Sequence, residues 1–286
     1  MLTVLISGLA SGALFAAAAL VYNLTFSTSK VLGVTTGQNA MLGGVFGAWF
    51  MGTLHMSAPL ALLGSMAVGA TFGFVTDLVA IRRVLNRSDE HLWLLSTLAL
   101  ATMTEQTVAL WWGTEPLPFP RLIHQDFTAG RADQKYWLPI IAVLLMAGGI
   151  ELFYRRTLYG KLFVAMSEDP FAARARGIPT NRIRALSFVI SGAMGGFAGF
   201  AAGQLTFAYF ALGISLSLNG FIALAVGGLG SNLGALVGGA ALGVSSAIAT
   251  YFIGGEYQNT VAVGLLMVAL LIKPAGLFGA QTARPV

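Results

Sequence analysis

Long apolar runs separated by short polar stretches form the dominant pattern of this chain. The runs are about 20 residues long, the length that a helix needs to cross the hydrocarbon core of a membrane. A shorter run at 212–229 either spans or re-enters the membrane. The pattern predicts an all-α, polytopic transmembrane helical bundle with about eight or nine spans, since a barrel would show short alternating segments. The other helices are predicted at residues 2–26, 40–54, 60–81, 92–112, 136–153, 185–207, 233–253 and 261–272.

Three polar stretches interrupt these runs. Residues 27–39 form a polar link that is poor in helix formers. Residues 113–135 contain three closely spaced prolines, which predict an irregular loop on the outer side. Residues 154–184 form the longest interruption and hold seven of the sixteen Lys and Arg residues.

A short helix is predicted within residues 154–184. Asp169 can cap its first free N–H groups, and Pro170 suits the first helical position. Gly177 suits the left-handed residue after the last turn, and Pro179 prevents continuation. A helix of about seven residues is shorter than the roughly 12–15 residues needed for marginal stability in water. Another surface must therefore hold it, either the rest of this domain or a soluble partner.

The composition agrees with a membrane protein. Hydrophobic residues make up 56% of the 286 residues and charged residues 9%, against roughly 25% charged in soluble domains. The mean hydropathy is +0.78. The absence of cysteine excludes disulfides and thiolate metal sites, and the three histidines show no ligand spacing, so no metal site is predicted.

The positive charge follows the expected membrane topology. With about nine spans and an external N-terminus, thirteen of the sixteen Lys and Arg residues fall on the cytoplasmic side. Only Arg121, Arg131 and Lys135 fall outside. Cytoplasmic loops of membrane proteins carry such an excess, so residues 154–184 are expected in the cytoplasm. Topology explains the net charge of +5, and nucleic-acid binding is not expected.

Glycines repeat at every fourth residue in two places. One face of each helix is therefore nearly bare, and the backbones of neighbouring helices can approach closely. Tight packing is the first expectation, and helices with little side-chain interlock can also slide or tilt. The first set is Gly195, Gly199 and Gly203, and the second set is Gly230, Gly234 and Gly238.

Asp77, Glu105 and Glu151 are the acids within predicted spans, where ionisable groups are costly and often functional. Asp77 lies five residues before Arg82, and Glu151 lies four before Arg155, so pairing or snorkelling is expected for both. Glu105 and its neighbour Gln106 lack such a partner in the sequence. They face either the transport pathway or a helix interface.

Several uncharged polar residues are candidates for lining a cavity. Asn219 is expected to form a hydrogen bond across helices. The others form either a cavity lining or a plain cytoplasmic turn: Thr35, Thr36, Gln38 and Asn39. No catalytic triad, redox motif or G-x-x-x-x-G-K-[S/T] phosphate loop is present in the sequence, so an enzyme is not expected.

Three blocks of sequence, in this order, carry a resemblance. They are TLYGKLFVAMSEDPFAARARGI with LSFVISGAMGGFAGFAAG following, ALAVGGLGSNLGALVGGAALG at 223–243, and KPAGLFG at 273–279. The chain resembles the permease subunits of bacterial ABC importers for branched-chain amino acids, the Leu/Ile/Val type. The resemblance extends over most of the chain and implies a single permease domain, residues 1–286, in the bacterial inner membrane.

The resemblance also implies partners. Two permease subunits, identical or homologous, form the pathway, and two cytoplasmic ATPase subunits bind ATP and magnesium. A binding protein delivers solute from outside, and this chain itself binds no cofactor. The cytoplasmic coupling loop, 154–184, would dock on an ATPase. The residues that would do so are Glu168, Asp169, Pro170, Phe171, Ala172, Ala173, Arg174, Arg176, Gly177 and Ile178.

One departure from the family concerns the substrate. Members have a small residue, His, Gly and an acid after the first helix, whereas residues 34–39 here read VTTGQN, without the His or the acid. Branched-chain or other small amino acids are the expected solutes, with urea, short amides and aromatic acids as alternatives. A stand-alone ion-coupled carrier or channel is the competing class. Such carriers often contain internal repeats with paired broken helices, and no duplication is evident in the sequence.

Overall fold

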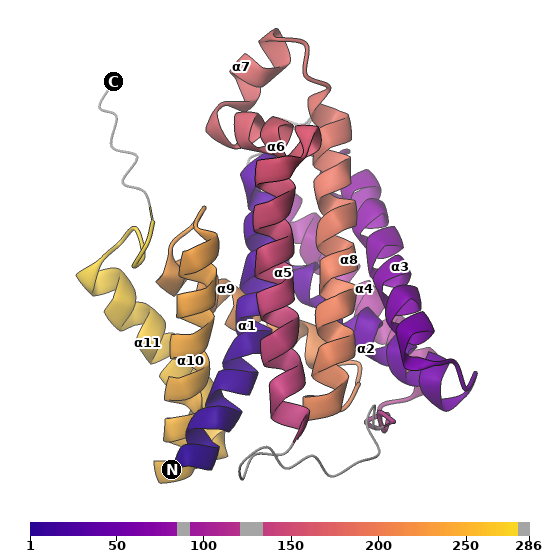
Figure 1. The fold of residues 1–286 in the computed structure, drawn as a ribbon, viewed down its shortest axis with the longest axis vertical. Helices are drawn as coiled ribbons and strands as arrows, with labels where there is room; N and C mark the ends of the chain where they lie inside the picture. Colours follow the sequence, from indigo (N-terminus) through magenta and orange to yellow (C-terminus); the bar gives the residue numbers. More distant parts are fainter. Residues whose placement is uncertain (85–91, 121–133, 280–286) are drawn as a thin grey trace.

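The computed structural model describes residues 1–84, 92–120 and 134–279. Its regular secondary structure is helical, apart from one isolated bridge between Leu117 and Ala208, and short loops connect the helices (Figure 1). The sequence expectations for Arg87, His91, Arg121, His124, Arg131 and Arg284 lie outside the described residues. The long helices are α1 (Leu2–Ser29), α2 (Thr36–Gly52), α3 (Ala58–Thr76), α4 (Leu92–Trp112), α5 (Trp137–Arg156), α8 (Thr180–Thr206), α9 (Leu212–Gly227), α10 (Asn232–Phe252) and α11 (Gln258–Ile272).

Short elements connect the long helices. Two helices, α6 (Leu158–Glu168) and α7 (Pro170–Ala175), join α5 to α8. The end of α3 continues as a π-helix, η1 (Asp77–Ile81). Two 3₁₀ turns, η2 (Gln134–Tyr136) and η3 (Gly255–Tyr257), lead into α5 and α11.

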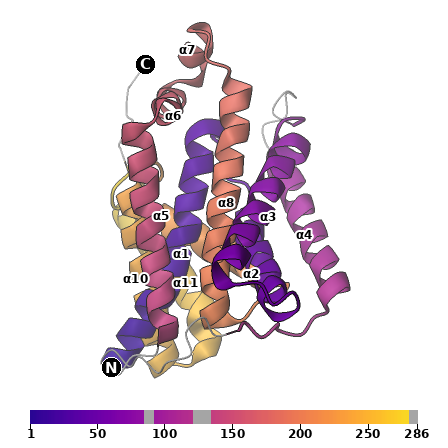
Figure 2. The same ribbon diagram turned by 45° about the vertical axis from the view of Figure 1, so that its right-hand side comes forward.

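The long helices form an elongated bundle around α1 and α8. The first packs mainly on α10 and α9, and the second on α3 and α2. Figure 2 shows α3 and α4 on one side of α8 and α5 with α1 on the other. The N-terminus lies at one end of the bundle, whereas α6 and α7 lie at the other end, which we call the basic end (Figure 1).

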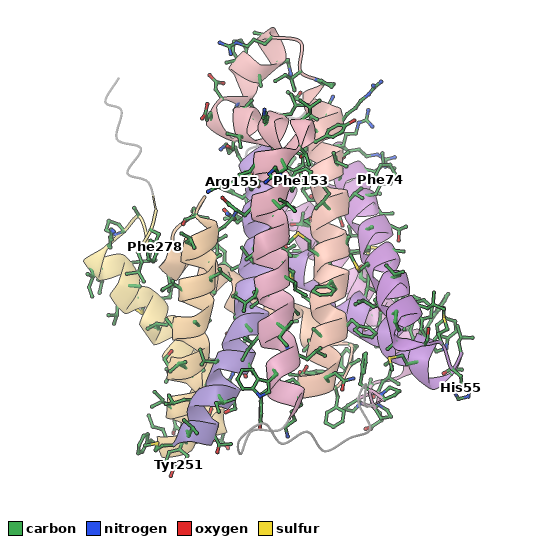
Figure 3. All side chains as sticks on the ribbon, viewed as in Figure 1. His55, Phe74, Phe153, Arg155, Tyr251 and Phe278 are labelled. Atoms are coloured by element: carbon green, nitrogen blue, oxygen red, sulfur yellow. The ribbon has the colours of Figure 1, made fainter. Side chains whose placement is uncertain are left out.

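Basic residues of the described chain gather at the basic end. Figure 3 places Arg155 there, on α5, and His55 and Tyr251 toward the opposite end. The Lys and Arg residues at or beside helix ends on the basic side are Lys30, Arg82, Arg83, Arg155, Arg156, Lys161, Arg174, Arg176, Arg182, Arg184 and Lys273. At the opposite end the described chain contributes Lys135, within η2.

Six helices of the described chain are long and apolar enough to cross a membrane, which confirms a polytopic helical bundle. Two others, α2 and α9, are shorter, at 17 and 16 residues. Length and composition alone therefore support fewer spans than the eight or nine predicted. The six are α1, α3 with η1, α5, α8, α10 and η3 with α11.

The predicted polar link at 27–39 is shorter in the structure. Helix α1 extends to Ser29 and α2 begins at Thr36, which leaves residues 30–35 between them. The hydroxyl groups of Thr25, Ser27 and Thr28 donate to carbonyls three or four residues earlier. These side chains therefore satisfy their own hydrogen bonds within the helix, which is why polar residues did not end it.

The loop 154–184 is more helical than predicted. It contains α6, the predicted short helix α7 and the first residues of α8, which begins at Thr180 rather than near residue 185. The side chain of Thr157 caps α6 by accepting from Gly160 N at 2.9 Å. Phe163 and Met166 on its inner face are buried, so packing stabilises this 11-residue helix.

Most of the repeated glycines lie where helices touch. Methyl groups at Gly195 and Gly199 would overlap Asn39 and Ala40 of α2, and Gly203 faces the ring of Phe119. Gly234 and Gly238 lie against the backbone of α9 in the same way. The expectation for Gly230 was wrong. It lies in the turn before α10 with φ +88°, no atom lies within 4 Å of a methyl group built there, and its N–H donates to Asn23 Oδ1 of α1 at 2.9 Å.

Candidate functional site

Helix α7 has the ends that the sequence predicts. The Asp169 carboxylate accepts from Phe171 N at 2.8 Å and from Ala172 N at 3.0 Å, and Pro170 occupies the first turn. Gly177 has φ +80°, a left-handed conformation that an L side chain would strain. The caps therefore satisfy both ends of a helix of six residues.

The inner side of α7 rests on its own domain. Ala173 is buried in an apolar cluster that includes Leu24 of α1 and Ile183 of α8. The Arg174 guanidinium donates to Thr180 Oγ1 at 3.2 Å, which ties α7 to the start of α8. This packing stabilises a helix that is too short to be stable alone.

The outer side of α7 is open. Phe171 is 82% exposed, so its apolar ring is not stabilised by burial within this chain. Ile178 is half-buried and Ala173 is buried. The remaining residues of the predicted coupling segment are exposed: Glu168, Asp169, Pro170, Phe171, Ala172, Arg174, Arg176 and Gly177.

Helix α6 contacts the end of α1 and the end of α5. Lys30, directly after α1, donates from Nζ to the Ser167 carbonyl at 2.6 Å. Partial burial lowers the pKa of Lys30. The ring of Phe163 packs edge-on against Phe153 of α5, with centroids 5.3 Å apart. The sequence reasoning missed α6, although the cap at Thr157 and the apolar pair three residues apart, Phe163 and Met166, were a readable signal.

A buried ion pair lies at the start of α8. Arg184 Nε donates to Asp77 Oδ1 at 2.8 Å, which links the start of α8 to η1 at the end of α3. The Asp77 side chain is 3% exposed and that of Arg184 11%. The expected pairing of Asp77 with Arg82 was therefore wrong, because η1 directs the carboxylate into the bundle. The expected pair of Glu151 and Arg155 is present and exposed.

Helices α2 and α9 both begin about halfway along α8. Asn39 lies against Gly195, near the middle of α8, and Gly37 lies against the Gly213 carbonyl at the start of α9. From there α2 runs toward the end that carries His55 (Figure 3). Helix α9 runs toward the basic end, because Gly220 lies against Ala18 of α1 and the turn after α9 contacts Asn23 of α1. We call residues 34–39 with Gly213 and Ser217 the central junction.

Hydrogen bonds between neutral groups hold the central junction. Ser217 Oγ accepts from Gly37 N at 2.9 Å and donates to the Val34 carbonyl at 2.8 Å. Val34 N donates to Thr97 Oγ1 of α4 at 3.4 Å. Sequence reasoning missed Ser217 and Thr97, since each belongs to a helix far away along the chain. The interpretation of residues 35–39 as a plain turn was wrong, because Thr35, Thr36, Gln38 and Asn39 are all buried.

Gln38 and Asn39 are buried without the hydrogen bonds that their side chains require. Gln38 is fully buried beside Gly213, and neither its Nε2 nor its Oε1 has a partner. Asn39 Oδ1 also has none. A buried polar group left unpaired costs about 1–3 kcal/mol, so these atoms mark a place where the described chain alone does not complete the hydrogen bonding.

The remaining predicted pathway residues take no part in the hydrogen bonds that hold the central junction. Glu105 is 8% exposed and shares the buried face of α4 with Thr97 and Val108, which favours its interface interpretation. Gln106 is exposed on the other face of α4. Asn219 donates from Nδ2 to the Ser215 carbonyl of its own helix at 2.9 Å, so the expected hydrogen bond across helices was wrong.

Comparison with known proteins identifies the class of this bundle. The family model described as "Branched-chain amino acid transport system / permease component" matches residues 4–271. The chain belongs to this permease family. The high-affinity branched-chain amino acid transport system permease LivH of Escherichia coli K12 is 26% identical over 98% of this chain and 96% of its own length. BraD of Pseudomonas aeruginosa, a permease of the same description, is 28% identical over 99% and 97%.

Two further comparisons concern part of the chain and the fold. LivM of Salmonella typhimurium, also a permease of a branched-chain amino acid system, is 30% identical over 51% of this permease and 35% of LivM. The solved structure of PsaBC from Streptococcus pneumoniae in complex with Fab has a TM-score of 0.52 at 12% identity, covering 97% of this chain and 93% of its own. That likeness concerns the fold alone.

The family resemblance predicted from sequence is thus confirmed. The chain is a permease subunit of an ATP-driven ABC importer and a multi-pass protein of the bacterial inner membrane. The family consists of transport permeases rather than enzymes, and ATP is hydrolysed on partner subunits.

Proposed function

We propose that this permease imports branched-chain or other small amino acids. The observation that carries the proposal is similarity over nearly the whole chain to LivH and BraD, whose names state this transport activity. Urea, short amides and aromatic acids are the alternative cargoes for the same machinery. These alternatives arise because residues 34–39, in the central junction, lack the His and the acid of the family pattern.

The proposed complex contains two permeases, two ATPases and a binding protein. The basic end faces the cytoplasm, because an excess of Lys and Arg marks the cytoplasmic side of a membrane protein. The N-terminus then lies outside, and the chain crosses the membrane nine times if the segments that contain α2, α4 and α9 are counted with the six longer spans. The second permease is identical or homologous to this chain. ATP and magnesium bind to the ATPases, and the binding protein delivers the solute at the opposite end.

Residues 154–184 form the coupling loop in this proposal. Phe171 is the central contact, because it is the large apolar side chain that α7 leaves open at the basic end. Two contacts connect this loop to the bundle: Lys30, directly after α1, bonds to Ser167 of α6, and Arg184, at the start of α8, bonds to Asp77 of η1. The proposed contact segment is Glu168, Asp169, Pro170, Phe171, Ala172, Ala173, Arg174, Arg176, Gly177 and Ile178.

The solute pathway passes the central junction. Irregular backbone at membrane depth is tolerated only against protein or water, and residues 30–35 are such a segment. Closure of the ATPases would move α7 and thereby shift α2 against α8 and α9. Thr35, Thr36, Gln38 and Asn39 are the pathway residues favoured by burial at this junction, whereas Glu105, Gln106 and Asn219 have weaker support.

Uptake by cells tests the proposed cargo. Cells with and without the gene are given radiolabelled leucine, urea or benzoate, each with and without ATP depletion. Loss of ATP-dependent leucine uptake in the deletion is the expected result. Loss of urea or benzoate uptake instead would reject the amino-acid cargo while retaining the importer.

A further inference from the structure

The unpaired atoms of the central junction form a complementary set. Gln38 Nε2 is a donor, whereas Gln38 Oε1 and Asn39 Oδ1 are acceptors, and none of the three has a partner in the described chain. Gln38 is fully buried and Asn39 is 5% exposed. A ligand that satisfies this set must offer an acceptor and a donor within a few bonds of each other.

The surroundings of this set are neutral but polarised. Tyr22 of α1 interacts with the hydroxyl groups of Thr36 and Ser217, and the hydrogen bonds that Val34 and Gly37 form with Thr97 and Ser217 join uncharged groups. The first turns of α2 and α9 meet here, and a helix N-terminus carries a partial positive charge. A carboxylate is therefore favoured near the donor, and the uncharged groups that hold the central junction suit a ligand with no net charge.

We infer that Gln38 and Asn39 bind the headgroup of a zwitterionic amino acid as it crosses the bundle. The α-carboxylate accepts from Gln38 Nε2 beside the two helix N-termini, and the α-ammonium donates to Gln38 Oε1 and Asn39 Oδ1. This inference rests on the proposed function and deepens it, since it assigns the part of the solute that this permease recognises. An anion such as benzoate lacks the donor that the two acceptors require.

The structure holds this site in a closed arrangement. Gly37 packs on the Gly213 carbonyl, and Gly213 packs on the Gln38 amide, so α2 and α9 leave no room for a solute between them. These contacts involve glycines on both helices and interlock no large side chains. The headgroup gains access when the start of α2 moves away from the start of α9.

The test uses the complete importer in proteoliposomes with radiolabelled leucine and ATP. Gln38→Met keeps the side-chain length and removes both unpaired atoms. ATP-dependent uptake is expected to fall roughly tenfold or more, the loss that follows when buried hydrogen bonds to a charged group are removed. The thermal midpoint of the variant is expected to be unchanged or higher, because two unpaired buried atoms are gone.

Ser246→Ala is the matched control. Ser246 is also buried with an unpaired hydroxyl, but it lies on α10 and outside the central junction. Its removal is expected to leave uptake unchanged. Asn39→Leu is a second variant, for which uptake is also expected to fall while the midpoint is kept.

Different outcomes separate the two claims. If the parent complex imports leucine and the Gln38→Met and Asn39→Leu variants import it equally well, the headgroup site is overturned and the proposed function stands. A fall in uptake that tracks a lower thermal midpoint in both variants shows a structural role and also overturns it. Parent complex that imports acetamide or benzoate but not leucine overturns the amino-acid cargo and the headgroup site together.

Discussion

At the residue scale, the buried pair of Asp77 and Arg184 connects η1, at the end of α3, to the start of α8. Their positions are 107 residues apart in the chain, yet the bond measures 2.8 Å. Arg184 Nη2 is buried and lacks a partner, so the pair is not fully satisfied. Two charges taken out of water are stable only while both are present. The pair therefore favours one relative position of η1 and the start of α8.

A double-mutant cycle measures this pair. Asp77→Leu or Arg184→Met alone is expected to destabilise the permease by about 3–5 kcal/mol, because each leaves a buried charge uncompensated. The double variant is expected to recover most of that loss. Thermal unfolding in detergent measures both effects. Glu151→Ala is the control, since its pair with Arg155 is 52% and 78% exposed and is expected to contribute less than about 0.5 kcal/mol. Additive losses in the double variant would show that the two residues act independently.

Local residue patterns were readable from the sequence, but distant partners were not. Asp169, Pro170 and Gly177 act within a few residues of their own positions, so their roles at the ends of α7 could be predicted. The partner of Asp77 could not, because a sequence shows Arg82 nearby and does not show which helix will pack against η1. The same holds for Ser217, which completes the central junction from another helix.

At the element scale, α6 and α7 form a platform that rests on the ends of α1, α5 and α8. The platform is fixed by packing of Phe163 and Met166, by the Lys30 contact and by the Arg174 contact. Its outer surface presents Phe171. An element that is fixed below and open above is suited to transmit the motion of a partner into the bundle.

The exposed phenylalanine gives a direct test of docking. Phe171→Glu is expected to abolish co-purification of the ATPase subunits, since a charge replaces the apolar contact. The permease itself is expected to insert and to keep its thermal midpoint, because the side chain is 82% exposed. Phe278→Glu is the control, since Phe278 is 51% exposed and lies beyond α11, away from α7 (Figure 3). Normal co-purification of Phe171→Glu would reject this coupling surface.

The glycine contacts between α8 and α2 give a second test at this scale. A methyl group at Gly199 would overlap the carbonyl of Ala40, so Gly199→Ala is expected to destabilise the permease by about 1–3 kcal/mol. Gly148→Ala on α5 is the control, because nothing lies within 4 Å of a methyl group there. Thermal unfolding of the two variants compares the sites. Equal midpoints would mean that the close approach of α8 to α2 is not required.

At the scale of the whole molecule, the bundle places a polar junction midway between the platform of α6 and α7 and the opposite end. The apolar runs predicted the helices and the bundle, because membrane helices must be long and apolar. They did not predict that α2 and α9 begin beside each other, since that arrangement depends on which glycines meet. The predicted count of eight or nine spans exceeds the six long apolar helices of the described chain partly because α2 and α9 are short. The unpaired atoms of Gln38 became visible only in three dimensions.

The most direct measurement of the central claim is leucine accumulation in proteoliposomes that contain the complete importer. Leucine is supplied with the binding protein on one side, and ATP is present or absent on the other. The account predicts accumulation above the external concentration only with ATP, and no effect of a proton or sodium gradient. Accumulation that follows an ion gradient and ignores ATP would contradict the account and identify a stand-alone carrier.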